Sequence, residues 1–96
     1  MKLDNTFHKI NIGAAQNMSE ISDESVNLVV TSPPYPMIEM WDNILADQNN
    51  NIYSEFNKNN SYQIYELMHL ELDKVWEETL RVLKPGGIVC VNIGDA

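Results

Sequence analysis

Two runs of β-branched and other apolar residues, Val26–Thr31 and Ile88–Ile93, place the strongest constraint on how this chain can fold. Each run is almost continuously apolar, whereas a strand with one wet face alternates apolar and polar residues. The pattern predicts strands covered on both faces, as in a parallel sheet. The first run stops at Ser32-Pro33-Pro34-Tyr35-Pro36, because three prolines in four positions cannot continue a hydrogen-bonded ladder.

A long amphipathic helix is predicted ahead of the second run, from about Ile64 to Leu83. Apolar residues recur there at helical spacing, and acidic residues fall largely on the other face. A basic last turn, a proline and two glycines, Lys84-Pro85-Gly86-Gly87, predict its end. The apolar positions are Tyr65, Met68, Leu72, Val75, Trp76, Leu80 and Leu83, and the acidic ones are Glu66, Glu71, Asp73, Glu77 and Glu78.

Weaker patterns occupy the rest of the chain. Alternation over Phe7–Ile12 predicts a short strand, followed by a helix or turn over about 14–21 and a polar turn at 22–25. Residues 43–62 are rich in asparagine, which favours a mobile loop or a poorly ordered connection with a helical turn around Ile52–Phe56.

Taken in order, these elements predict an α/β fold with a mainly parallel sheet. Three strands and one long helix make a thin core for 96 residues, and no helix follows the last strand to cover it. We therefore expect one half of a domain. Cys90, between two valines of the second run, is predicted to be a small core residue.

Charge and composition exclude several classes of function. Six basic residues face fourteen acidic ones, a net charge of -8, so the chain has no general attraction to phosphate backbones. One cysteine excludes a disulfide framework and a cysteine-rich zinc site, and neither His8 nor His69 has a ligand partner at useful spacing, so no metal is assigned. No apolar run approaches the roughly 20 residues of a membrane span, and residues 1–5 are too polar for a secretory signal. A cytoplasmic location is expected.

The proline-rich segment that ends the first run carries the chemistry. It lies at the carboxyl end of a predicted strand, which is the edge where open α/β sheets bind ligands. Two consecutive prolines fix the backbone and remove two N–H donors, which leaves carbonyl acceptors. Ser32 adds a hydroxyl and Tyr35 a flat aromatic face. The set suits a planar ligand with an amino group, although a proline turn with a packed tyrosine is the plainer interpretation.

These residues resemble a known family. Val29-Val30-Thr31-Ser32-Pro33-Pro34-Tyr35-Pro36 is similar to the catalytic motif of site-specific DNA amino-methyltransferases. The segment from Leu72 through Leu83-Lys84-Pro85-Gly86-Gly87 to Val91-Asn92-Ile93-Gly94-Asp95-Ala96 resembles the next helix and strand of that family. Two blocks in the family's order make a specific signal, and they cover most of the chain apart from the asparagine-rich middle.

The resemblance implies a Rossmann-like fold and transfer of a methyl group from S-adenosylmethionine to an exocyclic amine of a base flipped out of double-stranded DNA. Ser32 and the carbonyl of Pro33 would accept hydrogen bonds from the amine, Pro34 would hold the turn and Tyr35 would stack on the base. The Ser-Pro-Pro-Tyr form is typical of N4-cytosine enzymes, whereas Asp-Pro-Pro-Tyr is usual in N6-adenine enzymes. N4-cytosine is therefore the leading interpretation and N6-adenine the alternative.

Three departures from the family bear on the cofactor and on DNA. The glycine-rich Phe-x-Gly-x-Gly motif is absent, and relatives often carry Gly-Asp where this chain has Gly13-Ala14. Gly13, Ala14, Ser32 and Asp95 are the predicted contacts to S-adenosylmethionine. No basic recognition region is present, so DNA would be read by a region outside this chain. The chain would be the amino-terminal, catalytic-motif half of the enzyme. A second hypothesis is a non-catalytic module that docks a complementary subunit or associates with itself.

Overall fold

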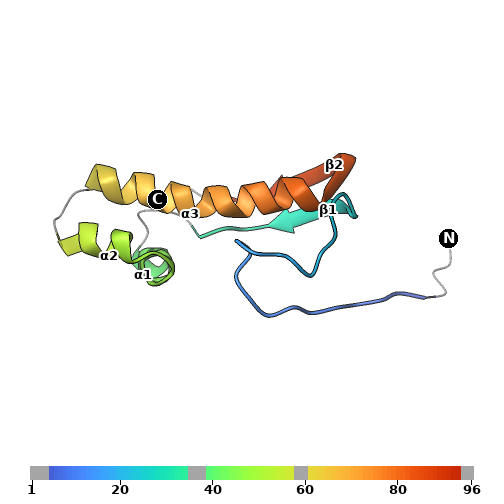
Figure 1. Cartoon of the computed structure of the whole chain (residues 1–96), viewed down its shortest axis with the longest axis horizontal. Helices are drawn as coiled ribbons and strands as arrows, with labels where there is room; N and C mark the ends of the chain where they lie inside the picture. The colour runs from blue at the N-terminus through green and yellow to red at the C-terminus, as the bar shows by residue number, and fades with distance from the viewer. Residues whose placement is uncertain (1–4, 35–38, 58–60, 94–96) are drawn as a thin grey trace.

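The computed structural model describes residues 5–34, 39–57 and 61–93, without the side chains of residues 39–41, 53, 56, 57 and 61. The elements, in chain order, are β1 (Val26–Thr31), α1 (Glu39–Gln48), α2 (Asn50–Asn57), α3 (Ser61–Val82) and β2 (Leu83–Val91). Figure 1 shows α3 running along the two strands, with α1 and α2 grouped toward its amino-terminal end. The radius of gyration is 16.2 Å, above the roughly 12 Å of a compact domain of this length.

Strands β1 and β2 lie side by side in parallel, and the three helices stand in the connection between them. Leu28 lies opposite Ile88, and Thr31 lies opposite Val91. The prediction of an α/β fold with a parallel sheet is confirmed. In the part of the chain that the structure describes, the sheet has two of the three predicted strands.

The junction between α3 and β2 follows the predicted turn. α3 ends at Val82, and Leu83 already pairs with Val26, but the next pairs begin at Ile88. Residues 84–87 therefore bulge out of the ladder, and Gly86 has a φ of 80°, a left-handed conformation that favours glycine. β2 begins at Leu83 and ends at Val91, where the sequence predicted a strand over 88–93.

The long helix is confirmed, but the prediction of its buried face was wrong in part. Glu71 and Thr79 are buried, whereas Tyr65 and Leu80 are exposed. The reason is that both buried polar groups have partners, so burial does not leave them unsatisfied. The Thr79 hydroxyl donates to the Val75 carbonyl at 2.7 Å, and the carboxylate of Glu71 accepts hydrogen bonds from two neighbouring side chains.

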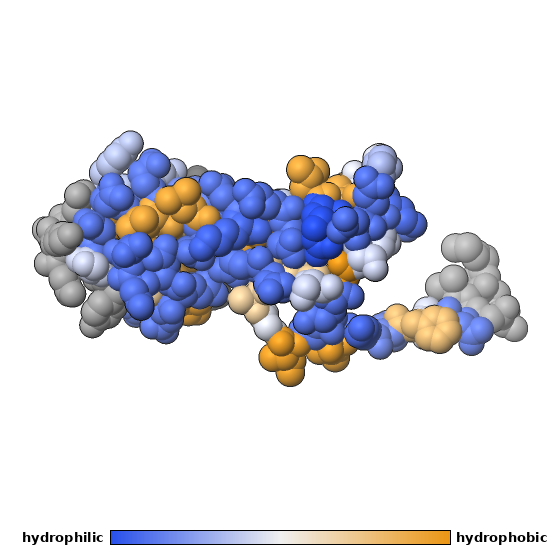
Figure 2. Space-filling view, in the orientation of Figure 1, coloured by the Kyte–Doolittle hydropathy of each residue, from blue (hydrophilic) through white to orange (hydrophobic). Residues whose placement is uncertain are grey.

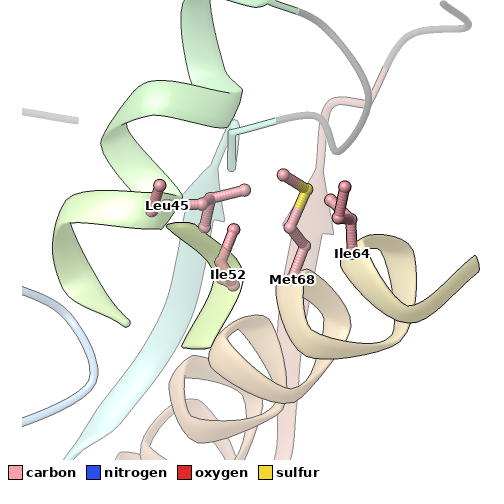
Figure 3. Packing of buried hydrophobic residues seen from close by; sticks show 5 residues of the cluster. Leu45, Ile52, Ile64 and Met68 are labelled. Carbon is pink, nitrogen blue, oxygen red and sulfur yellow. The ribbon is translucent and has the colours of Figure 1, made fainter. Parts of the chain in front are cut away.

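Helices α1 and α2 replace the loop that the sequence predicted over 43–62, so that prediction was wrong. Asn49 lies between the two helices, and its Oδ1 accepts the backbone N–H of Asn51 at 2.9 Å, which caps α2. Asparagine is disfavoured in helix interiors but is favoured at such caps. The apolar residues among the asparagines pack against α3, and this tertiary packing supplies helix stability that propensity does not. The buried cluster, seen in Figure 3, consists of Leu45, Ala46, Ile52, Ile64 and Met68.

The predicted strand at Phe7–Ile12 is not formed. These residues have no regular secondary structure, and Phe7, Ile10 and Ile12 are almost fully exposed. Figure 2 shows apolar side chains along this segment, which extends away from the body of the molecule. Alternating apolar and polar residues suit a strand, but a strand also has to pair with a neighbouring strand. In the described chain no strand lies beside this segment to pair with it. Turns follow at Ala14–Asn17 and Met18–Ile21, which agrees with the predicted helix or turn.

The described residues leave one face of the sheet largely uncovered. Leu28, Val30 and Ile88 are 54%, 73% and 61% exposed, and the pairing places them on one face together with Cys90, which is also exposed. The prediction that Cys90 is a core residue was therefore wrong for this chain. Cys90 lies in an apolar run typical of a strand covered on both sides, but the described residues cover one side of the sheet more fully than the other.

Candidate functional site

The carboxyl ends of β1 and β2 meet at one edge of the sheet. Thr31 pairs with Val91, and the backbone N–H of Asn92 donates to the Thr31 carbonyl at 2.9 Å. Ser32, the next residue, therefore begins the proline segment directly beside the chain that leaves β2. The two sequence blocks that resemble the methyltransferase family meet where Thr31 pairs with Val91, 60 positions further along the chain. They therefore lie next to each other at the edge where parallel α/β sheets bind ligands.

Exposure differs from residue to residue along the proline segment. Ser32 is exposed, Pro33 is buried and Pro34 is half-buried. Pro33 is thus packed against the rest of the chain, while Ser32 lies at the surface of the edge. Tyr35 lies outside the described residues, so its predicted stacking role is not examined by the structure. The arrangement offers oxygen acceptors on a backbone that two consecutive proline rings restrict.

Gly13 and Ala14 lie in a different place. Together with residues up to Ile21 they line a hollow of about 220 Å³ formed by the turns that precede β1. The Ala14 carbonyl accepts the N–H of Asn17 at 3.2 Å, which closes the first of these turns. A Cβ built on Gly13 would meet nothing within 4 Å, so the backbone there borders open space. Asp95, the remaining predicted cofactor contact, lies outside the described residues.

An apolar groove of about 350 Å³ connects these turns to β1. Met18 and Ile21 line both this groove and the hollow beside Gly13. On the other side the groove is lined by β1 as far as Thr31, the residue before Ser32, and by Val82 of α3. The turns, the end of α3 and the strand that leads to the proline segment therefore share one surface.

The side chain of Arg81 connects α3 to the turns before β1 through hydrogen bonds, a role that the sequence did not predict. The guanidinium of Arg81 donates through Nη1 to the Ile21 carbonyl at 2.9 Å and to Asp23 at 2.6 Å, and through Nη2 to the Met18 carbonyl at 2.8 Å. Its Nε and Nη2 also donate to both carboxylate oxygens of Glu78, at 2.8 and 3.0 Å. The only sequence signal was the i, i+3 spacing of Glu78 and Arg81 on a helix.

Glu78 completes this network from the other side. Its Oε2 accepts the backbone N–H of Met18 at 2.6 Å. The hydrogen bonds from Arg81, followed by the one from Met18, lower the pKa of the Glu78 carboxyl to about 2. The same pairing raises the pKa of Arg81 further above its ordinary value, so both groups stay charged throughout the physiological range.

The hollow beside Gly13 is too small to enclose a nucleoside-sized cofactor by itself. Its volume of about 220 Å³ is below the roughly 300–1,000 Å³ of sites that enclose drug-sized ligands. Its lining combines small residues such as Gly13 with larger ones such as Met18 and Glu20. No carboxylate stands at position 14, where Ala14 has no side-chain acceptor. Further walls for a nucleoside-sized cofactor would have to come from outside these residues.

Within 5–34, 39–57 and 61–93, no three histidine, cysteine or acidic side chains are grouped so that they could hold a metal ion. Over the same ranges, no helix has both the length and the apolar character that crossing a membrane requires.

The chain is similar to known proteins over most of its length. A family model described as DNA methylase matches residues 26–96, which include both strands and the proline segment. The chain is 53% identical to the type II methyltransferase M.MjaI of Methanocaldococcus jannaschii and 48% identical to the type II methyltransferase M.MthZI of Methanothermobacter thermautotrophicus, in each case over 95% of its own length. It spans 34% and 26% of these two relatives. No solved structure matches the chain significantly.

Proposed function

Because the chain belongs to the N6/N4 DNA methylase family, we propose that it carries the base-binding motif of an enzyme that methylates the exocyclic N4 amine of cytosine in double-stranded DNA. Its parallel sheet and crossover helices are part of the Rossmann-like fold of methyltransferases. Since the chain spans about a third of one relative and a quarter of the other, the activity is that of a larger assembly to which this chain contributes.

The observation that carries the proposal is the position of Ser32–Pro34. These residues stand at the carboxyl edge of a parallel sheet, beside Asn92 of the neighbouring strand's end, and Ser32 is exposed. A base brought to this edge would meet oxygen acceptors before any donor from the two prolines, which have no N–H. That is the chemistry an amino group requires, because its hydrogens need acceptors.

The chain's own residues would act on the amine in two ways. The amine nitrogen is a weak nucleophile because its lone pair is delocalised into the ring. Acceptors at Ser32 and at the Pro33 carbonyl would orient its two hydrogens and stabilise the positive charge that develops on nitrogen. Tyr35 would hold the flipped base by stacking, worth roughly 1–3 kcal/mol, which is comparable with the few kcal/mol that base extrusion costs.

S-adenosylmethionine, when bound, supplies the methyl group as an electrophile. In this chain Gly13 and Ala14 would form one wall of its site, and Ser32 and Asp95 would lie at the sheet edge. The remaining contacts, and the region that reads the DNA sequence, belong to the rest of the assembly. A cytoplasmic location, and a type II modification role like that in the names of the relatives, are part of the same proposal.

A second candidate function rests on the uncovered sheet face. Leu28, Val30 and Ile88 are more than half exposed, and a parallel sheet is normally covered on both sides. This observation favours a half-domain that is inert alone and docks a complementary subunit. The two candidates differ in whether the isolated chain binds S-adenosylmethionine. Calorimetric binding tighter than about 1 mM, worth roughly 4 kcal/mol, supports a working cofactor wall, and no heat supports the inert half.

The base choice is tested in a chimera in which this chain replaces the matching third of the Methanocaldococcus relative. We expect methylated DNA from the chimera to contain N4-methylcytosine by nucleoside mass spectrometry. Finding N6-methyladenine alone would reject cytosine and support the alternative base. Finding neither, from a folded chimera, would reject the catalytic proposal.

The role of the proline segment is tested in the same chimera. Tyr35→Ala is expected to lower the methylation rate roughly 5- to 150-fold, which corresponds to the loss of 1–3 kcal/mol of stacking. Tyr62→Ala is the matched control, because Tyr62 is an exposed tyrosine on α3, outside the proline segment. Equal rates for the two variants would remove Tyr35 from the site.

A further inference from the structure

We propose that Arg81 is a positioning residue that holds the cofactor wall in register with the base-binding strand. The inference rests on the proposed function, because it assumes that the turns lined by Gly13 and Ala14 contact S-adenosylmethionine. It adds a residue from α3 that lies in neither of the two sequence motifs assigned to base or cofactor.

The guanidinium of Arg81 uses all of its N–H donors. Arginine has five N–H donors in a planar fork, and Arg81 makes five hydrogen bonds, of 2.6 to 3.0 Å. Three go to residues of the turns before β1, and two go to Glu78 on its own helix. A lysine at this position has three donors on one nitrogen and cannot reach all of these acceptors.

Two of the carbonyls that accept from Arg81 belong to residues that border the hollow beside Gly13. Met18 and Ile21, whose carbonyls Arg81 holds, are residues that line both the hollow beside Gly13 and the groove along β1. Fixing them fixes the wall that the hollow and the groove share. The network of Arg81, Glu78 and Asp23 therefore sets where the cofactor side lies relative to the strand that ends at Ser32.

The backbone of α3 at Arg81 is also hydrogen-bonded to the chain that enters β1. The N–H of Glu24 donates to the Arg81 carbonyl at 2.9 Å, and the N–H of Ser25 donates to the Val82 carbonyl at 2.8 Å. The entry to β1 is thus hydrogen-bonded to the last turn of α3, while the Arg81 side chain holds the turns just before it. The hydrogen bonds that hold residues 18–25 through side chain and backbone therefore come largely from the last turn of α3.

The experiment compares Arg81→Lys and Arg81→Gln with Lys74→Gln, a matched loss of positive charge on the same helix, in the chimera described above. We expect both Arg81 variants to raise the KM for S-adenosylmethionine at least 5-fold, with kcat within about 2-fold and the KM for DNA unchanged. Amide hydrogen exchange of residues 18–25 in the 96-residue chain should accelerate at least 10-fold in both. Lys74→Gln should leave all these values unchanged.

Each other result overturns a defined part. Wild-type KM and exchange in Arg81→Lys would show that charge alone suffices and would overturn the positioning role. Faster exchange with an unchanged KM would make Arg81 a structural residue only, which also overturns it. If the unsubstituted chimera neither methylates DNA nor binds S-adenosylmethionine, the proposed function fails and this inference with it, whatever the exchange rates show.

Discussion

The helical end and the sheet end of this molecule are stabilised in different ways. At the helical end, Leu45, Ile52 and Met68 from three helices are fully buried against one another. At the sheet end, Leu28 and Val30 of β1 are more than half exposed, and the segment before β1 is held mainly by hydrogen bonds to Arg81 and Glu78. The end that carries the candidate chemistry is therefore the end with the less complete apolar core.

The helical cluster is therefore complete within the described chain, whereas the sheet beside the candidate site is only partly covered. Hydrophobic burial is the main driving force for folding, and the helical cluster has it within the chain itself. The sheet gains it only when its second face is covered. Three measurements test this contrast.

The first measurement removes a buried side chain from the helical end. Met68→Ala is expected to lower the free energy of unfolding by about 2–5 kcal/mol, because it deletes a fully buried side chain and leaves a cavity. Urea unfolding followed by helical circular dichroism measures the loss. Val30→Ala on the sheet, where the side chain is 73% exposed, should cost less than about 0.5 kcal/mol. Equal losses would contradict the contrast between the two ends.

The second measurement titrates the ionic network at the sheet end. The folded-state pKa of Glu78 is about 2, below the roughly 4.3 of an unfolded glutamate. A lowered pKa stabilises the fold above the unfolded value, and this contribution is lost as the pH falls from about 4.3 toward 2. Glu78→Gln should therefore lose less stability than the wild type across that acid window, while Glu77→Gln, an exposed neighbour on α3, should follow the wild type. Parallel curves for all three proteins would remove Glu78 from the network.

The third measurement places a methyl group in the hollow. A Cβ at residue 13 meets no atom within 4 Å, so Gly13→Ala should change the free energy of unfolding by less than about 0.5 kcal/mol. If the hollow holds a ligand, the same methyl group would contact that ligand, and the KM for S-adenosylmethionine in the chimera would rise several-fold. An unchanged KM would place the cofactor elsewhere.

Sequence reasoning succeeded where a local pattern and its tertiary partner agree. The strand at Val26–Thr31, the helix α3 and its end before Lys84 were all predicted, because continuous apolar runs and helical periodicity directly encode burial. The meeting of Thr31 with Asn92 could also be anticipated, since parallel strands end at the same edge.

The failures occurred where a pattern depends on something distant. Alternation at Phe7–Ile12 gives no strand, because pairing requires a neighbour that the local sequence does not encode. The asparagine-rich stretch forms helices, because Ile52 and Leu45 bury against α3 and Asn49 serves as a cap. Three of the five hydrogen bonds of Arg81 join residues about 60 positions apart in the sequence, so no local pattern could reveal them.

The exposed Cys90 has a practical consequence. It is the chain's single cysteine, and it lies opposite Val30 on the uncovered face. A maleimide dye attached through its sulfur would report, by reaction rate or fluorescence, the moment when another polypeptide shields that surface from water. The molecule thus carries a natural labelling handle for following its own assembly.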